Sequence, residues 1–187
     1  MSGESFDVNY PDVELINQPT GMSCWAASAA MVVGWRDQVS IDPIAIVAGT
    51  GIWSAYTNGL QPTDFQTLAT AWRLTAEPPQ CYSVDGLRTL LTNKGPLWVA
   101  AAVPGFHAIV VTGLYSDGTG DNTFVRINDP WDRDPGTPGA PGAYLNTHDH
   151  GSQYVLSLQQ FANEYETPAT YPGVAIQILR SEVGRGS

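Results

Sequence analysis

The segment 17–33 constrains the fold more than any other part of the 187-residue chain. A turn-rich lead-in, NQPTGMS, runs into the small and apolar sequence CWAASAAMVV. A helix drawn through Trp25 to Trp35 has apolar residues on nearly every side, which is typical of a helix buried through the centre of a domain. Either Ser23 or Thr20 could cap this helix. Its first residue would be Cys24.

A cysteine at the start of a helix has unusual chemistry. The unpaired N–H groups and the positive end of the helix dipole favour a thiolate over a thiol at Cys24. Two alternatives remain open for it, a buried structural cysteine and a disulfide to Cys81, the second cysteine of the chain. Because one bridge is a weak framework for a core-bearing domain of this size, we interpret Cys24 as a candidate nucleophile and Cys81 as a bystander.

Two apolar runs farther along the chain predict a β-hairpin. His107 opens the run HAIVVTGL, Asp129 closes the run FVRIND, and the turn formers YSDGTGDN lie between them. If the hairpin is symmetric about Gly118, His107 faces Asp129 and Ile109 faces Ile127. Apolar side chains then share one face of the sheet.

Shifting this hairpin by one residue would place Asn128 opposite His107. The same shift would set Ile109 against Arg126, which mixes an apolar and a charged side chain on one face. We therefore predict that Asp129 orients the His107 imidazole, with Asn128 as the runner-up.

Gln18 completes the group of polar residues that a cysteine nucleophile needs. It lies six residues before Cys24, on the loop that leads into the predicted helix. Its side-chain amide could donate a hydrogen bond to an oxyanion formed where the sulfur attacks.

These elements resemble the papain-like cysteine peptidases. The resemblance rests on the Gln-x5-Cys-Trp element at 18–25, the strand-initial His107 and the Asn-Asp-Pro-Trp sequence at 128–131. The chain is similar to the bacteriocin-leader-processing peptidases and to the papain-like effector peptidases of plant pathogens. In its order of elements the resemblance covers roughly residues 13–165.

The resemblance implies an α+β fold in which the helix that carries the nucleophile packs on an antiparallel sheet. By position, Cys24 would be the nucleophile, His107 the general base and acid, Asp129 the orienting group and Gln18 the oxyanion donor. The implied activity is hydrolysis of peptide or amide bonds through an acyl-enzyme, without a cofactor or metal.

The resemblance also implies a biological setting, a secreted bacterial effector or toxin. Its partners would be a protein or peptide substrate and a cognate inhibitor or immunity protein. Two alternatives stay open: a glutamine deamidase or transglutaminase-like enzyme with the same triad, and a catalytically inert papain-like module. The inert module would bind peptides through the aromatic loop near Trp53.

Charge composition narrows the partners further. The chain has 18 acidic and 8 basic residues, a formal net charge of −10. An acidic surface repels nucleic acid and anionic lipid, so we expect neither as a partner. The start, MSGESFD, lacks the basic and apolar regions of a signal peptide, and the sequence contains no apolar run of membrane-spanning length. We expect a cytoplasmic protein, or one exported without a cleaved signal peptide.

The remaining patterns predict one domain over 1–187, with a polar arm at 1–12 and a flexible end at 184–187. His148-Asp149-His150 supplies two potential metal ligands, but without a third at a recognisable spacing we predict a solvated loop. A Pro/Gly-rich loop at 132–142 is expected to form one wall of the cleft. The predicted helices are 40–49, 62–73, 83–93 and 158–165, and the predicted strands are 13–16, 97–103, 107–114, 124–129, 152–156 and 174–179.

Overall fold

The computed structural model describes residues 3–101, 107–134, 142–166, 176–183 and 185. Its helices are α1 (Cys24–Asp37), α2 (Pro43–Thr50), α3 (Ala55–Asn58), α4 (Phe65–Ala71), α5 (Val84–Lys94) and α6 (Leu158–Phe161), with a 3₁₀ turn at Pro62–Asp64 and a π-helical turn at Ala162–Glu166. Its strands are β1 (Phe6–Asn9), β2 (Leu74–Ala76), β3 (Leu97–Ala101), β4 (His107–Ser116), β5 (Thr123–Asp129), β6 (Ser152–Ser157) and β7 (Gln177–Ser181).

The strands of the described residues form one seven-stranded antiparallel sheet, ordered β2-β7-β3-β4-β5-β6. β4 is the long central strand of this sheet. Along one side it pairs first with β3 and then with β1, and along the other side it pairs with β5. The predicted α+β class is confirmed.

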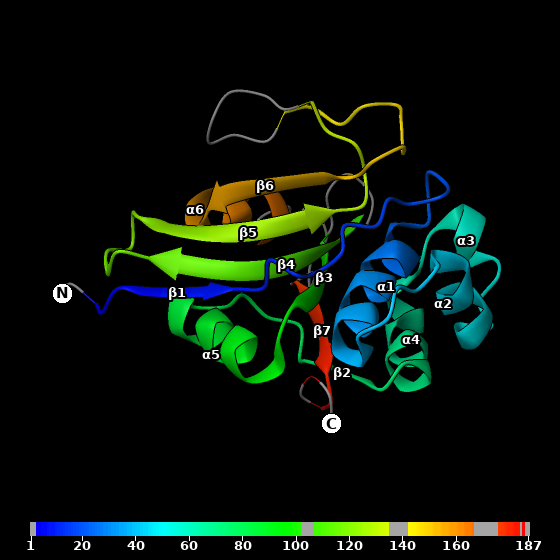
Figure 1. Ribbon diagram of the computed structural model, residues 1–187, viewed down its shortest axis with the longest axis horizontal. Coiled ribbons are helices and arrows are strands. Elements are labelled where there is room, and N and C mark those ends of the chain that lie inside the picture. Colours follow the sequence, from blue (N-terminus) through cyan, green and yellow to red (C-terminus); the bar gives the residue numbers. More distant parts are fainter. Residues whose placement is uncertain (1–2, 102–106, 135–141, 167–175, 184, 186–187) are drawn as a thin grey trace.

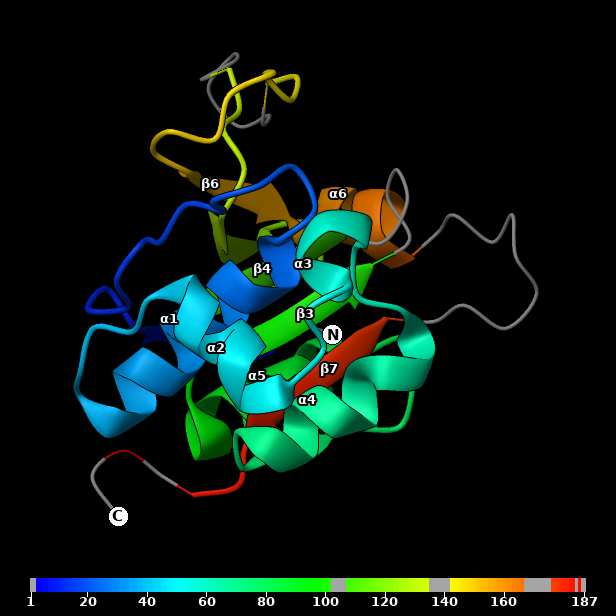
Figure 2. The same ribbon diagram turned by 90° about the vertical axis from the view of Figure 1, so that its right-hand side faces the viewer.

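Helices α1 to α4 gather at the end of the sheet where β4 begins and β5 ends (Figure 1, Figure 2). Every residue of α1 from Cys24 to Arg36 is buried, as its all-round apolar sequence predicts. Two buried hydrogen bonds fasten α1 to the sheet. The Ser28 hydroxyl donates to the Ala108 carbonyl at 3.0 Å, and the Trp98 indole donates to the Trp25 carbonyl at 3.1 Å.

Alternate residues of β3 and β4 pack in two different hydrophobic clusters. Trp98, Ala100, Ala108 and Val110 pack in one cluster with α1, α2 and α4. Their neighbours in the chain, Leu97, Val99, Ile109 and Val111, pack in a second cluster with α5 and α6. Both faces of the central strands are therefore buried, which explains why these runs read as continuously apolar.

The N-terminal prediction was wrong. Residues within the predicted arm 1–12 form β1, and the predicted strand 13–16 is irregular. Phe6 and Val8 pack against the second core cluster, while Asp7 is exposed and pairs with Arg126. Two apolar residues in a four-residue strand give too short an alternation to stand out in the sequence.

The predicted register of the β4–β5 hairpin was also wrong, by two residues at Ile127 and Asn128 and by three between the bulge and the turn. Ile127 pairs with Val111, not with Ile109, because the turn is centred later than predicted and Thr112 is bulged out of the ladder. A shift of two residues keeps every side chain on its original face. Asp129 therefore still shares a face with the first residue of β4.

One smaller difference concerns β2. β2 pairs with β7 but was not predicted, because only three residues, 74–76, lie between the predicted helix 62–73 and the Pro-containing sequence EPPQ at 77–80. Most of the predicted flexible end at 184–187 lies outside the described residues. The described helices include none long and apolar enough to cross a membrane.

The link between α1 and β4 gives a stability prediction. Ser28→Ala removes the buried hydrogen bond to Ala108, so the free energy of unfolding should fall by about 1–2 kcal/mol in urea denaturation. Ser54→Ala is the control, because Ser54 is exposed and its side chain makes no capping hydrogen bond. Equal stabilities for the two variants would contradict the role given to this link.

Candidate active site

The turn before α1 leaves the start of the helix open. Ser23 is the N-cap residue, but its side chain makes no cap hydrogen bond to the first turn. Its hydroxyl instead accepts from the Thr20 N–H at 2.9 Å and donates back to the Thr20 carbonyl at 3.2 Å. The Ser23 hydroxyl therefore stabilises the turn between Thr20 and Ser23 and does not cap the helix. It leaves the backbone N–H groups beside Cys24 free of a capping side chain.

The first residues of α1 and β4 meet at this point. The Cys24 side chain lies close enough to His107 to raise the pKa of the imidazole. On the other side of the ring, His107 Nε2 lies 2.7 Å from Asp129 Oδ1. Because Nε2 is taken by the carboxylate, Nδ1 is the ring nitrogen that faces the sulfur. The structure thus brings the three sequence-predicted residues together in the order Cys24, His107, Asp129.

All three side chains are withdrawn from solvent, with exposed fractions of 8% for Cys24, 4% for His107 and 0% for Asp129. Burial alone would lower the pKa of His107, but the charge and hydrogen bond of Asp129, with a smaller effect of Cys24, raise it to about 10. Since this value exceeds the ordinary 6.5, the pair contributes its full stability below pH 6.5 and loses it as pH rises through about 10.

The Asp129 carboxylate is held from several sides. Oδ1 also accepts the Trp131 backbone N–H at 2.9 Å, while Oδ2 accepts the Tyr154 hydroxyl at 2.9 Å and the Tyr144 hydroxyl at 3.3 Å. A buried carboxylate needs such donors to stay charged. Asn128, the runner-up, points elsewhere. Its amide donates to the Val13 carbonyl and accepts from Gln153.

Gln18 is fully buried beside the turn that precedes α1. Its backbone N–H donates to the Pro130 carbonyl at 2.9 Å, which ties the lead-in loop to the end of β5. Its Nε2 donates to the Thr20 carbonyl at 2.7 Å, and its Oε1 has no partner among the described residues. An amide nitrogen carries two hydrogens, so one donor remains available.

Aromatic rings surround the imidazole. Trp131 and Tyr144 both meet His107 edge-on, at centroid distances of 5.9 and 5.4 Å. Tyr144 follows directly on the Pro/Gly-rich loop, most of which lies outside the described residues. His148 meets Trp131 edge-on at 4.9 Å, so the segment after the loop folds back over the site.

Asp132 fixes that segment. Its carboxylate accepts the backbone N–H groups of Asp149, His150 and Gly151 at 2.8, 3.0 and 2.7 Å. Burial alone would raise the pKa of Asp132, but these donors and the Thr147 side chain lower it to about 2. The backbone of this loop is therefore held in place, although the side chains of Asp149 and His150 are exposed.

Sequence reasoning missed the residues behind Asp129. Tyr154 is hydrogen-bonded to the carboxylate, and Arg133 and Tyr165 are hydrogen-bonded to the Tyr154 hydroxyl. Only the position of Tyr154 in a predicted strand could have suggested it. Strand pairing places Tyr154 opposite Ile127, which is two residues from Asp129 and on the same face.

Cys24 and Cys81 are both free thiols, so the disulfide alternative is wrong. The described residues contain no group of three or more His, Cys, Asp or Glu side chains that could hold a metal ion. The aromatic loop near Trp53 contains α3, and Trp53 itself is 55% exposed.

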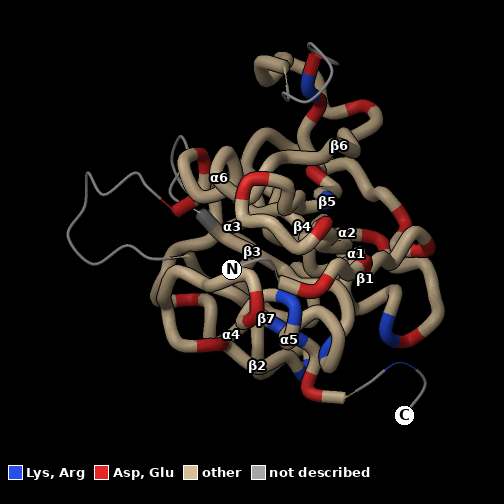
Figure 3. Tube along the Cα trace, turned by 90° about the vertical axis from the view of Figure 1, so that its left-hand side faces the viewer, with Lys and Arg blue, Asp and Glu red and all other residues tan. Residues whose placement is uncertain are grey.

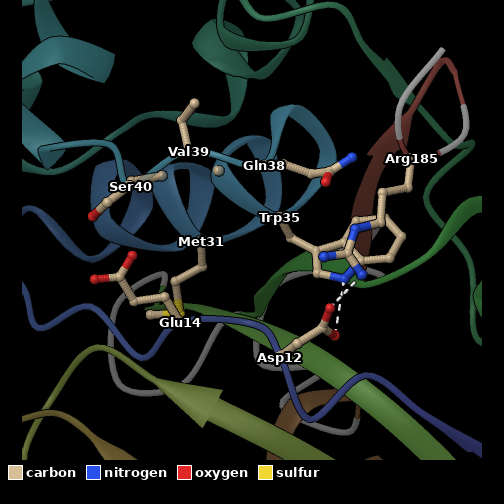
Figure 4. A pocket seen from close by; sticks show the side chains of 10 residues that line it. Asp12, Glu14, Met31, Trp35, Gln38, Val39, Ser40 and Arg185 are labelled. Atoms are coloured by element: carbon tan, nitrogen blue, oxygen red, sulfur yellow. Dashed lines mark hydrogen bonds and ion pairs between the residues drawn. The ribbon is translucent and has the colours of Figure 1, made fainter.

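A hollow of about 260 Å³ lies on the other end of α1, beside Met31 and Trp35. Figure 4 shows Asp12 and Arg185 joined by an ion pair there, with the Arg185 guanidinium next to the Trp35 ring. Trp35 is about three helical turns beyond Cys24. The hollow is therefore separate from the site around His107.

A family model described as papain-like cysteine protease AvrRpt2 matches residues 4–137, well over half of the chain. The chain belongs to this family. It is therefore a papain-like cysteine peptidase, a hydrolase, and the sequence-based expectation of family, fold and enzyme class is confirmed. The comparison with curated proteins gave no match.

The matched region of this papain-like peptidase contains Gln18, Cys24, His107 and Asp129. Tyr144, the first of the tyrosines around the carboxylate, lies beyond its end, as do β6 and α6. The support of Asp129 described above thus comes partly from outside the region that defines the family match.

The charge of Asp129 gives a direct prediction for His107. Asp129→Asn keeps the size of the side chain but removes its charge, so the pKa of His107 should fall from about 10 by about one to three pH units. A pH titration of the His107 ring resonances by NMR measures this shift. Asp149→Asn, at an exposed position, is the control. An unchanged titration in Asp129→Asn would show that the carboxylate does not set the pKa.

Proposed function

We propose that this papain-like peptidase hydrolyses peptide bonds through Cys24, His107 and Asp129. The observation that carries the proposal is the contact of Cys24 with a buried imidazole whose other nitrogen is bonded to a carboxylate. His107 takes the thiol proton, which leaves a thiolate beside an imidazolium. The buried Asp129 charge stabilises the imidazolium that this transfer creates.

The chemical steps follow from the two ring nitrogens. The Cys24 thiolate attacks the substrate carbonyl carbon, and the carbonyl π electrons move to its oxygen. His107 then gives its Nδ1 proton to the leaving amine as the C–N bond breaks, which leaves a thioester. A water attacks the thioester carbon while His107 accepts its proton. The C–S bond then breaks, the carboxylic acid product leaves, and Cys24 is again a thiolate beside the His107 imidazolium.

Gln18 is the proposed second donor of the oxyanion hole, with the Cys24 backbone N–H as the first. Its support is the full burial of Gln18 next to the turn before α1 and the second hydrogen of its amide. The hydrogen bond to Thr20 holds the amide in one orientation before substrate arrives. Donors fixed in this way favour the transition state because they need no reorganisation.

The substrate class proposed is a protein or peptide that is neutral or basic. Figure 3 shows acidic residues spread along the chain trace and few basic ones, in keeping with the net charge of −10. Such a surface favours a basic partner over nucleic acid or anionic lipid. The effector or toxin role, with its inhibitor, stays a prediction from the resemblance, and Cys24-dependent toxicity on expression inside a host cell would test it.

The hydrolytic activity has a simple test. Wild-type protein should cleave fluorescein-labelled casein, and Cys24→Ala should lower the rate by about a thousandfold or more because the nucleophile is gone. Cys81→Ser is the matched control, since Cys81 is an exposed free thiol outside the site. Full activity of Cys24→Ala would refute the proposal. Ammonia release from glutamine peptides without cleavage would favour the deamidase alternative, and no Cys24-dependent reaction at all would favour the inert module.

The oxyanion role of Gln18 predicts a selective kinetic effect. Gln18→Ala should lower kcat by about a hundredfold with little change in KM, because the lost hydrogen bond forms fully only in the transition state. Gln66→Ala, at an exposed position on α4, should leave both constants unchanged. A loss confined to KM would contradict the assignment of Gln18.

A further inference from the structure

The hydrogen bonds behind Asp129 have only one consistent arrangement of protons. Arg133 Nη1 lies 2.8 Å from the Tyr154 hydroxyl, and because a guanidinium only donates, this hydroxyl oxygen accepts. The Tyr154 hydroxyl lies 2.9 Å from Asp129 Oδ2. Because a carboxylate only accepts hydrogen bonds, Tyr154 is the donor in this bond.

The direction of the remaining bond follows. Tyr154 and Tyr165 hydroxyls are 2.7 Å apart, and either could in principle donate. Tyr154 has a single hydroxyl proton, and that proton already forms the hydrogen bond to Asp129. Tyr165 must therefore donate to Tyr154, so that the Tyr154 oxygen accepts twice and donates once, its full capacity.

We propose that Tyr154, directed by Arg133 and Tyr165, is a positioning residue that holds the Asp129 carboxylate turned toward His107. This inference rests on the proposed function, because it assigns Tyr154 a part in the same reaction. It goes beyond the three residues of the triad and beyond the part of the chain that the family match covers.

Other groups around the carboxylate agree with this role. Asp129 is faced by His107 from β4, Tyr144 from the segment after the loop, Tyr154 from β6 and Tyr165 from the π-helical turn. Arg133 is the cation of this cluster. Its side chain is 8% exposed, and its guanidinium lies over the Tyr144 and Tyr154 rings at 4.3 and 4.8 Å.

Glu164 balances the Arg133 charge through an ion pair of 2.9 Å. The guanidinium is therefore held by a carboxylate on one side and by hydroxyls on the other. Burial, followed by the negative charge of Asp129, raises the pKa of Tyr154 well above 10. The Tyr154 hydroxyl therefore stays protonated at neutral pH and can donate its hydrogen bond to Asp129.

The geometry also explains why the other donors cannot replace Tyr154. The Trp131 N–H bonds to Oδ1, the same oxygen that His107 uses, so it does not fix the second oxygen. Tyr144 reaches Oδ2 only at 3.3 Å, a longer and weaker bond than the 2.9 Å of Tyr154. Among the described residues, Tyr154 therefore donates the shortest hydrogen bond to Oδ2.

The test is Tyr154→Phe, which deletes only the hydroxyl. The rate of Cys24 alkylation by iodoacetamide is measured from pH 3 upward, with mass spectrometry separating the Cys24 and Cys81 peptides. Losing this donor loosens the hold on the carboxylate and weakens its support of the imidazolium. The thiolate–imidazolium pair should then form only at higher pH, so the low-pH half-point of the rate should rise by about one pH unit. With casein as substrate, kcat should fall by about tenfold with KM nearly unchanged.

Three variants separate this role from a structural one. Tyr10→Phe removes a hydroxyl that donates to the Leu91 carbonyl at 2.7 Å, so it should lower thermal stability without moving the half-point. Tyr165→Phe should move the half-point much less than Tyr154→Phe, because Tyr154 still donates to Asp129. Tyr144→Phe should move it in the same direction by a smaller amount, and serves if Tyr154→Phe does not fold.

The outcomes separate the inference from the proposed function. If the wild type cleaves casein in a Cys24-dependent way but Tyr154→Phe keeps the wild-type half-point, the positioning role is wrong and the hydrolytic function stands. If the wild type cleaves nothing, the function fails, yet the alkylation half-points still decide the role of Tyr154. An equal shift in Tyr10→Phe would also overturn the inference, since the effect would then reflect stability alone.

Discussion

The hydrogen bond between His107 and Asp129 is the interaction on which the rest of the site depends. It joins the first residue of β4 to the last residue of β5 at 2.7 Å, in a place that solvent barely reaches. By occupying Nε2 it turns Nδ1 toward Cys24. An unpaired imidazole in the same surroundings would have its pKa lowered by burial, and would hold a proton less readily.

Helix α1 and the sheet each supply part of the site. α1 brings Cys24 to the end of the sheet and is fastened there through Ser28 and Trp98. Strands β4 and β5 bring His107 and Asp129 to the same end, and β6 adds Tyr154 beside them. Stability and chemistry are thus linked, because contacts that hold the layers together also set the distance between sulfur and imidazole.

Much of this arrangement could be predicted from the sequence, for identifiable reasons. The all-round apolar segment after Cys24 signals a buried helix, and the runs that begin at His107 and end at Asp129 signal strands. Even the wrong register led to the right carboxylate, since a shift of two residues preserves the face. Asn128 and Asp129 differ by one residue, and that difference does reverse the face.

The parts that could not be predicted depend on contacts distant in sequence. Tyr154 lies 25 residues after Asp129, beyond the Pro/Gly-rich loop. Arg133, Glu164 and Tyr165 show no pattern until the chain has folded. The bulge at Thr112 depends on the pairing of β1 with β4, because the Tyr10 N–H bonds to its carbonyl. Short strands such as β1 form because they pair with a neighbouring strand of the sheet. Their own alternation of apolar and polar residues is too short to predict them.

The central claim is that Cys24 and His107 act as a paired nucleophile and proton carrier. The most direct measurement is the pH dependence of Cys24 alkylation by iodoacetamide in the wild type and in His107→Ala, with the Cys81 peptide as an internal reference. The account predicts rapid labelling of Cys24 well below the ordinary thiol pKa of about 8.5, lost in His107→Ala. Slow labelling with the same profile as Cys81 in both proteins would contradict it.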